Sequence, residues 1–264
     1  MTILLQIDSF TDTPYRGNPA AVCLLDRPPS ERWMQMIAAE MNLSETAFLV
    51  PQGEQRYHLR WFTPTVEVDL CGHATLAAAH FLRQQLGISQ QVEFDTASGR
   101  LTATYDGEWI ELDFPVLPVQ PAAPNVDIIS GLNVEPIFFG VSKHDSLVEV
   151  ENESMVRQCQ PDLNLIRRSG TRGVIITAVS QTGDYDFVSR FFVPGAGIDE
   201  DPVTGSAHCV LIPYWENKLG RTKLTGFQAS ARGGVVRGER IDDRVKLRGQ
   251  AVTVIECRLQ HPVE

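Results

Sequence analysis

The sequence has few of the features of a membrane, secreted or nucleic-acid-binding protein. No apolar run approaches the roughly 18 residues that a membrane-spanning helix needs. The first ten residues include Asp8 and too short an apolar stretch for a signal peptide, so we expect a cytoplasmic protein that does not bind membranes. Acidic side chains outnumber basic ones by 33 to 23, for a formal net charge of -10. This balance argues against binding of a nucleic-acid backbone.

Cysteine is scarce, and its spacing does not indicate a structural framework. None of the five cysteines forms a C-x-x-C pair, which argues against disulfides and a zinc ribbon. The segments Cys71-Gly72-His73 and His208-Cys209 bring ligand types close together, but without a second pair at a usual spacing. We therefore expect no metal site and interpret each thiol as a small buried apolar group. The cysteines are Cys23, Cys71, Cys159, Cys209 and Cys257.

The remaining composition is that of an ordinary globular protein. Apolar residues make up 43% and charged residues 21% of the 264 residues. A chain of this length predicts about two domains, each with enough residues to bury a core.

The chain contains an internal repeat. Gly72-His73-Ala74 resembles Gly205-Ser206-Ala207, 133 positions later, and Leu86-Gly87 matches Leu219-Gly220 at the same separation. Each copy predicts a helix that begins at a glycine-containing turn and ends at a glycine. The second copy contains Pro213, which must kink its helix or release one backbone hydrogen bond.

The repeat extends towards the N-terminal side of both helices. Arg60–Pro64 matches Arg190–Pro194 at a separation of 130, and the apolar run Thr46–Val50 is similar to Gly173–Thr177 at 127. A helix is predicted before each apolar run, at Glu31–Met41 and at Asp162–Arg168.

Strand hairpins are predicted after both central helices. Leu101–Tyr105 and Glu108–Phe114 flank Asp106-Gly107, a signal for a type I′ turn. The second copy has a looser hairpin, with Val235–Arg237 and Val245–Arg248 around Gly238–Asp243. Each half thus predicts a strand, a helix, two strands, a central helix and a hairpin.

These elements predict an α+β protein of two pseudo-symmetric domains, each a curved mixed β-sheet around a central helix. The central helices are nearly all apolar, which favours burial on most sides. The proline-rich segment 115–124 suits a linker. We place the domains at residues 1–118 and 125–264, and the last strand can pack on the first domain. Because each matched block is short, a chance repeat is the alternative.

The two helix starts form a candidate anion site. The first N–H groups of a helix lack backbone partners and lie at the positive end of its dipole. Gly72 and Gly205 let a ligand approach because they carry no Cβ. If the halves pack symmetrically, both starts can bind a substrate carboxylate or a developing oxyanion. The alternative is that these glycines only cap turns.

Three side chains near these turns can move or orient protons. His73 starts one helix, with Ser206 as its counterpart, and the helix dipole should hold it towards its neutral form. Asp201 can accept N–H groups from its turn or orient the histidine. Glu45 lies between a helix and an apolar strand, where partial desolvation would raise its pKa towards that of a general base. It can equally belong to a solvated turn.

Several blocks together resemble the phenazine-biosynthesis PhzF-like family, which has the diaminopimelate epimerase fold. They span almost the whole chain in order and are specific in combination. The blocks are Asp8-Ser9-Phe10, Gly17–Val22, Ser44–Phe48, Phe62-Thr63-Pro64 through Val68, Cys71–Thr75 and Glu200–Ala207.

The resemblance implies a cofactor-independent isomerase, with no metal and a small carboxylate substrate. In the phenazine enzyme, a glutamate of the Ser-Glu-Thr-Ala block shuttles a proton on a dihydro-hydroxyanthranilate ring, which assigns that role to Glu45. His73 and Asp201 would assist proton transfer. The N–H groups near Gly72, His73, Gly205 and Ser206 would bind the carboxylate. Asn18 is a weaker substrate-binding candidate because Asn-Pro also forms turns. The resemblance also implies a homodimer.

One position separates this chain from the racemase and epimerase relatives, which use two opposed cysteines. Cys71 occupies the first of these positions, but the second holds Thr204, whose alcohol cannot act as a thiol acid or base. Two-thiol racemisation is therefore disfavoured. Two alternatives stay open: a racemase or epimerase that uses Glu45 and Cys71, and a non-catalytic small-molecule binder.

Overall fold

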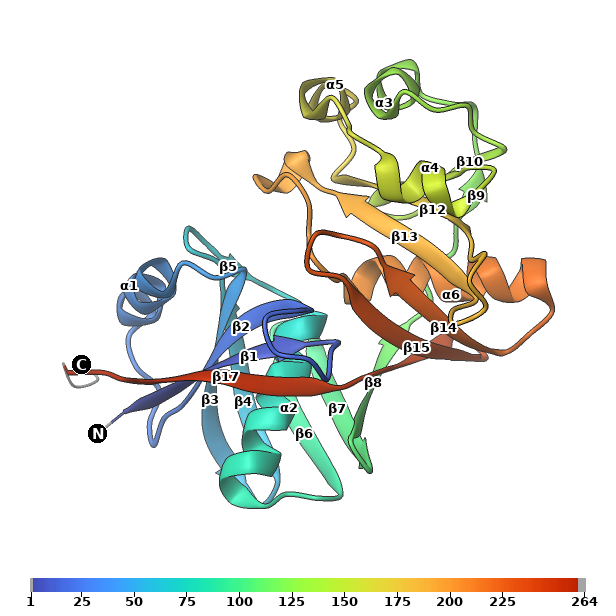
Figure 1. Ribbon diagram of the computed structural model, residues 1–264. Coiled ribbons are helices and arrows are strands. Elements are labelled where there is room, and N and C mark those ends of the chain that lie inside the picture. The colour runs from blue at the N-terminus through green and yellow to red at the C-terminus, as the bar shows by residue number, and fades with distance from the viewer. Residues whose placement is uncertain (1, 261–264) are drawn as a thin grey trace. The chain divides into compact units, whose positions relative to one another are not determined.

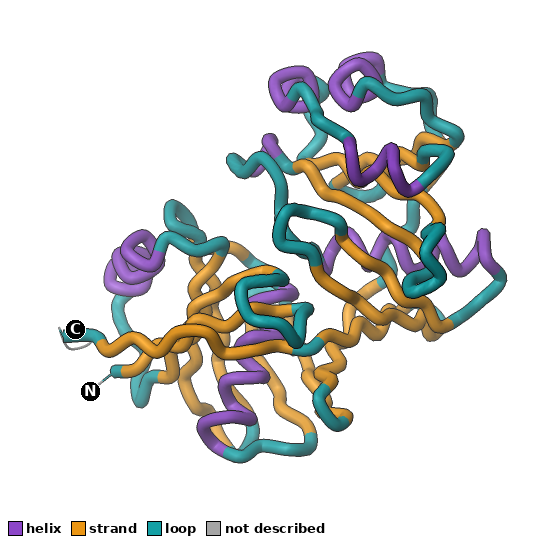
Figure 2. Tube along the Cα trace, viewed as in Figure 1, coloured by secondary structure: helices purple, strands orange, loops and turns teal. Residues whose placement is uncertain are grey.

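A computed structural model describes residues 2–260 (Figures 1 and 2). The chain divides into two compact units. The first comprises Met1–Asp113 and Arg248–Glu264, and the second comprises Phe114–Leu247. Segment 248–264 thus belongs with the N-terminal residues, and its strand β17 pairs antiparallel with β1.

The first unit contains a mixed sheet in which β17, β1, β2, β3, β4, β6, β7 and β8 pair in that order, while β5 pairs with one end of β4. The pairs β2–β3 and β4–β6 are parallel and the others antiparallel. The strands are β1 (Ile3–Ser9), β2 (Asn18–Leu24), β3 (Glu45–Gly53), β4 (Arg56–Phe62), β5 (Glu67–Val68), β6 (Gln91–Thr96), β7 (Gly99–Asp106), β8 (Trp109–Pro115) and β17 (Ala251–Arg258).

Two helices pack against this sheet. Helix α1 (Glu31–Met41) shares a core with alternate residues of β2 and β3, including Ala21, Cys23 and Phe48. The central helix α2 (Gly72–Leu86) lies against β2, β1 and β3. Most of its side chains are buried, as its apolar composition predicts.

The second unit contains another mixed sheet, in which β9, β10, β11, β12, β13, β14 and β15 pair in order. The pairs β11–β12 and β13–β14 are parallel. The strands are β9 (Gln120–Pro121), β10 (Phe138–Val141), β11 (Asp145–Glu149), β12 (Gly173–Val179), β13 (Phe187–Phe192), β14 (Lys223–Gln228), β15 (Gly234–Ile241) and β16 (Arg244–Gly249), the last of which also reaches into the first unit.

Helices cover both faces of this second sheet (Figure 1). Three short helices, α3 (Val126–Leu132), α4 (Glu153–Gln158) and α5 (Leu163–Arg168), share a core with Val174, Ile176 and neighbouring strand residues. The central helix α6 (Gly205–Leu219) packs against β14 and β15. A short 3-10 helix spans Pro194–Ala196.

The strand order confirms the internal repeat. Four successive pairs, from β2 to β7 in the first unit and from β11 to β15 in the second, are parallel, antiparallel, parallel and antiparallel. In both units the central helix comes between the third and fourth strands of this series. Both central helices have 15 residues and end at a left-handed glycine, Gly87 with φ 71° and Gly220 with φ 65°. The separation of 133 residues therefore relates equivalent backbone positions, and the α+β fold is confirmed.

Pro213 lies inside α6 without ending it. A proline cannot donate to the carbonyl four residues earlier, here that of Cys209. Leu117 N donates to this carbonyl instead, at 3.1 Å. The released backbone acceptor, one of the two outcomes that the sequence left open for Pro213, thus fixes the proline-rich segment that follows β8.

The predicted type I′ turn between β7 and β8 is wrong in detail. Asp106 pairs with Trp109, so the two loop residues are Gly107 and Glu108. Only Gly107 of these two has a positive φ, at 57°. Glycine at the first loop position with a positive φ is the pattern of a type II′ turn, in which only that residue needs the left-handed half of the map.

Candidate active site

The two central helices begin differently from the other α-helices of the described chain. Helices α1, α3, α4 and α5 each have a side-chain oxygen that caps the first turn. Within residues 2–260, α2 and α6 have no such cap at Cys71 and Thr204. Their first N–H groups are therefore left without a side-chain acceptor and suit an anion.

In the first unit, Glu45 at the start of β3 meets His73 in the first turn of α2. Glu45 Oε2 lies 3.0 Å from His73 Nε2, and the side chains are 16% and 6% exposed. The contact lacks hydrogen-bond geometry, and neither atom has a hydrogen-bond partner among the described residues. Glu45 is thus a largely buried carboxylate paired with a histidine and does not belong to a solvated turn.

The opposite nitrogen of the His73 ring is also surrounded. Asn18 Nδ2 lies 3.2 Å from His73 Nδ1, and Cys71 Sγ lies 3.5 Å from the same nitrogen. Ser44 Oγ donates to Asn18 Oδ1 at 3.1 Å, and Ser9 Oγ donates to the carbonyl of His73 at 2.8 Å. The ring is therefore held on both edges and at its backbone, which fixes its direction towards Glu45.

The charges in this cluster overturn two predictions from the sequence. Burial acts to raise the pKa of Glu45, but the positive charge of His73 outweighs it and the pKa is lowered. Burial acts to lower the pKa of His73, but the charges of Cys71 and Glu45 raise it well above its usual value. Since burial raises the pKa of the Cys71 thiol to about 11, Glu45 is the anion that matters near neutral pH. The pKa of His73 is thus raised, whereas the dipole argument from the sequence favoured the neutral form.

Glu45, Cys71 and His73 also form a group that could hold a metal ion. One ligand atom from each lies within 4.8 Å of the others, and together they offer oxygen, sulfur and nitrogen. This mixture is compatible with zinc. The prediction of no metal site considered only ligands close in sequence, whereas Glu45 reaches the other two through the pairing of β2 with β3 and the packing of α2 on them.

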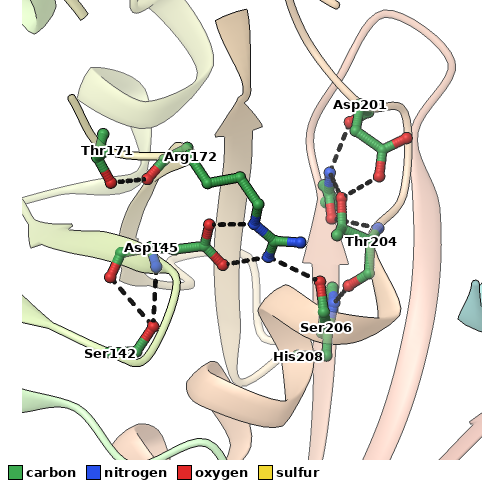
Figure 3. Close-up of polar contacts among 10 residues, drawn as sticks. Ser142, Asp145, Thr171, Arg172, Asp201, Thr204, Ser206 and His208 are labelled. Carbon is green, nitrogen blue, oxygen red and sulfur yellow. Dashed lines mark hydrogen bonds and ion pairs between the residues drawn. The ribbon is translucent and has the colours of Figure 1, made fainter. Parts of the chain in front are cut away.

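In the second unit, a hydrogen-bond network fixes the start of α6 (Figure 3). Thr204 Oγ1 donates to Asp201 Oδ2. The buried Gln228 accepts from Thr204 N at 2.9 Å and donates to the carbonyl of Asp201 at 2.7 Å. The Asp201 carboxylate thus accepts from the hydroxyl of a residue in its own turn.

The sequence argument missed one charged residue at this helix start. Arg172 precedes β12 and forms a two-point ion pair with the buried Asp145, at 2.8 Å and 2.5 Å. It also donates to Ser206 Oγ at 3.3 Å (Figure 3). The repeat contained a signal for it, because the separation of 127 that pairs Thr46 with Gly173 also pairs Glu45 with Arg172.

The predicted site residues therefore fall into two groups, one in each unit. Glu45, His73, Gly72 and Asn18 gather at the start of α2. Asp201, Gly205 and Ser206 gather at the start of α6, where Arg172 and Asp145 join them. No helix within residues 2–260 has both the length and the apolar character needed to cross a membrane.

Comparisons with known proteins agree with this architecture. The family model described as phenazine biosynthesis-like protein matches residues 7–257. An uncharacterized isomerase of Halalkalibacterium halodurans is 48% identical over 98% of both chains. The solved structure of a PhzF family phenazine biosynthesis protein from Enterococcus faecalis has a TM-score of 0.93 and 38% identity over 97% of both chains.

More distant structures share the fold alone. A hydroxyproline epimerase from Agrobacterium vitis has a TM-score of 0.64 at 11% identity, over 97% of this chain and 91% of that one. The fold is thus the epimerase-like one that the resemblance implied. Because the family model matches nearly the whole chain and a relative named as an isomerase is 48% identical, the chain belongs to the phenazine biosynthesis-like (PhzC-PhzF) family and is an enzyme of the isomerase class.

Proposed function

We propose that this isomerase moves a proton between two carbons of a small carboxylate-bearing substrate, with Glu45 as the general base and then the general acid. The contact of Glu45 Oε2 with His73 Nε2 carries this proposal. Both atoms are buried, and neither has a hydrogen-bond partner among residues 2–260. The two groups offset each other's charge, but the hydrogen-bonding capacity of these atoms is unused among the described residues and stays available to a ligand.

The charge state of the pair suits the first step. Because its pKa is lowered, Glu45 is an anion near neutral pH and can take a proton from a substrate carbon. The electron pair of the broken C–H bond moves into the unsaturated substrate. Glu45, now a neutral acid, returns the proton to a different carbon and becomes a carboxylate again. His73 stabilises the anionic form of Glu45 before and after this cycle.

The uncapped N–H groups at the start of α2, at Gly72 and His73, would bind the substrate carboxylate beside Glu45. In the second unit, the start of α6 offers N–H groups of the same kind at Gly205 and Ser206. Asp201 holds Thr204, the residue before α6, and we assign it to positioning this turn. Asn18 orients His73 through Nδ1.

Deuterium exchange tests the proposal. A panel of small cyclic unsaturated carboxylates is incubated with the enzyme in D2O, and deuterium on carbon is followed by mass spectrometry and NMR. We expect one substrate carbon to gain deuterium with the double bond moved. Glu45→Gln should lower this rate about 10²–10⁴-fold, the usual contribution of a positioned acid–base group. Glu40→Gln, an exposed change on α1, is the matched control.

Two outcomes would contradict the proposal. Full exchange activity in the Glu45→Gln variant would remove Glu45 from the proton transfer. Inversion of an amino-acid stereocentre in D2O, without movement of a double bond, would instead indicate a racemase or epimerase with Glu45 and Cys71 as unlike partners. Binding without exchange across the whole panel would favour the non-catalytic binder.

A further inference from the structure

One group of side chains has the composition and spacing of a metal site, and the proposed reaction uses only part of it. Glu45, Cys71 and His73 each bring one ligand atom to within 4.8 Å of the other two. Within residues 2–260, no other three histidine, cysteine or acidic side chains come together in this way. All three residues belong to the first unit, so the site needs nothing from the second.

The distances in this cluster are close to those of a tetrahedral zinc site. Zinc bonds of about 2.0–2.3 Å to oxygen, nitrogen and sulfur keep the ligand atoms about 3.3–3.7 Å apart. Here Glu45 Oε2 lies 3.0 Å from His73 Nε2, and Cys71 Sγ lies 3.5 Å from His73 Nδ1. These contacts involve different nitrogens of the ring. Small side-chain rotations therefore suffice to bring one nitrogen, the sulfur and the carboxylate onto one ion.

The buried polar atoms of the cluster have unused capacity to bind a ligand. Glu45 Oε2 and His73 Nε2 have no hydrogen-bond partner among the described residues, and the His73 side chain is only 6% exposed. The Glu45 side chain keeps 16% of its surface exposed, which leaves an approach for a small ion. The ring is also held in place, because Asn18 and Cys71 contact its Nδ1 and Ser9 Oγ donates to the carbonyl of His73. Such outer contacts orient a metal ligand before the metal binds.

The charges of the three groups match a divalent ion. With the thiol and the imidazole deprotonated, Glu45 and Cys71 carry one negative charge each and His73 is neutral, so that zinc makes the set neutral. The displaced protons pass to the solvent. A neutral set suits a buried position, where an uncompensated charge is costly. It also offsets the positive end of α2, which disfavours a cation that has no anionic ligand.

We propose that Glu45, Cys71 and His73 bind a zinc ion, and that this ion inhibits the enzyme by occupying the carboxylate of Glu45. The inhibition, though not the binding, rests on the proposed function, because a carboxylate bonded to zinc cannot take a proton from a substrate carbon. The mixture of oxygen, nitrogen and sulfur selects zinc over magnesium, which requires an octahedron of oxygen ligands.

The second unit has the same helix start without these ligands. At the equivalent positions, the start of α6 has Thr204 and Ser206, and the residue before β12 is Arg172 (Figure 3). Neither a neutral hydroxyl nor an arginine is a usual zinc ligand. The proposed site thus depends on its three side chains and not on the helix start alone.

Metal binding is tested first, without substrate. Zinc is titrated into the full-length protein by isothermal calorimetry, and cobalt is used as a spectroscopic substitute for zinc. We expect one zinc ion per chain and a thiolate-to-cobalt charge-transfer band that Cys71→Ser abolishes. This variant should bind zinc more than about 100-fold more weakly, because the loss of an outer-shell partner alone costs about 10–100-fold. Cys257→Ser, which changes a partly exposed thiol on β17 of the same unit, should keep the affinity and the band.

Inhibition is then measured with the deuterium-exchange assay, each variant being compared with its own metal-free rate. Zinc should stop exchange by the wild type, EDTA should restore it, and magnesium should have no effect. At a zinc concentration that halves the rate of the wild type and of Cys257→Ser, the Cys71→Ser variant should keep its own rate.

The two proposals fail in different ways. A Glu45→Gln variant with full exchange activity overturns the assigned base but not the metal site, which the cobalt band of the wild type supports. A wild type that binds zinc no more tightly than Cys71→Ser, or a cobalt complex without the thiolate band, overturns the metal site and leaves Glu45 as the base. Zinc bound as expected with undiminished exchange overturns the inhibition.

Discussion

The starts of α2 and α6 have the same backbone and different chemistry. Each helix begins at a glycine without a side-chain cap, after a residue whose carbonyl accepts from a side chain four residues on, Thr75 at 2.6 Å and His208 at 2.8 Å. At the strand that faces each helix start, however, one unit has Glu45 and the other Arg172.

The difference shows that a duplicated backbone frame can carry opposite charges at equivalent positions. Proton transfer requires a group that can take up and return a proton, whereas a permanent positive charge favours an anion. Glu45 beside His73 is a group of the first kind, and Arg172 beside Asp145 is one of the second. A single copy of the frame could not place both at the same strand position.

The largest expected effect comes from changing His73, the second residue of α2. His73→Gln removes the positive charge that lowers the pKa of Glu45, so burial should raise that pKa. We expect turnover of an exchanging substrate to fall about 10²-fold or more, with the acidic limb of the pH–rate profile moved to higher pH.

Its counterpart Ser206→Ala should mainly raise KM and leave the pH profile in place, because Ser206 contacts no group that titrates near neutral pH. Steady-state kinetics over a pH range measures both variants. Equal displacement of the two pH profiles would contradict the assignment of the titrating pair to Glu45 and His73.

The next effect concerns the strands that precede the two helices. At the place where β3 has Thr46, β12 has Gly173, and a Cβ there would lie 2.5 Å from the Phe191 ring. Gly173→Ala should therefore lower the free energy of unfolding by about 1–3 kcal/mol through overpacking. Gly53→Ala is the control, because no described atom lies within 4 Å of its Cβ position. Urea unfolding measures both, and equal stabilities would contradict the prediction.

The two histidines near the helix starts should titrate in opposite directions. Burial lowers the pKa of His208 to about 4, whereas the pKa of His73 is raised well above 6.5. NMR of the imidazole Cε1 protons should show His73 charged at pH 7 and His208 neutral at pH 5.5. Variants His73→Gln and His208→Asn assign the signals.

The same shifts give stability a defined pH dependence. The contribution of His73 is complete below its unfolded pKa of 6.5 and is lost as pH rises through its raised folded value. His208 has the opposite effect. Between pH 6.5 and about 4 its side chain is protonated in the unfolded chain but neutral in the folded chain, so the free energy of unfolding decreases as the pH is lowered. A neutral His73 at pH 6 would contradict the ion pair.

The smallest expected effect is at Cys71. Its thiol has a pKa of about 11 and is protonated near neutral pH, so it supplies no thiolate base. Cys71→Ser should change the exchange rate less than about 10-fold, far below the contribution of an acid–base group. Rates in D2O for this variant and for Glu45→Gln provide the comparison. A loss as large as that of Glu45→Gln would indicate catalysis with Cys71 as a second acid or base.

Much of the fold was predictable because it depends on local patterns. The repeat, the two central helices and their glycine ends follow from residue spacing, and Pro213 indicated a released carbonyl. The type of the β7–β8 turn was not predictable, because Asp106-Gly107 fits more than one strand register. The donor that pairs with the Cys209 carbonyl was also not predictable from the sequence, because Leu117 is distant from Cys209 along the chain.

The sequence by itself determined which chemical groups the protein has and where in the repeat they lie: Glu45, His73, Asp201 and the uncapped glycine-led helices. The tertiary structure alone decided their charge states and partners. A dipole argument treats His73 as isolated, whereas folding places a carboxylate 3.0 Å from it and reverses the direction of its pKa. Arg172 became visible for the same reason, because its pairing with the buried Asp145 joins residues 27 positions apart.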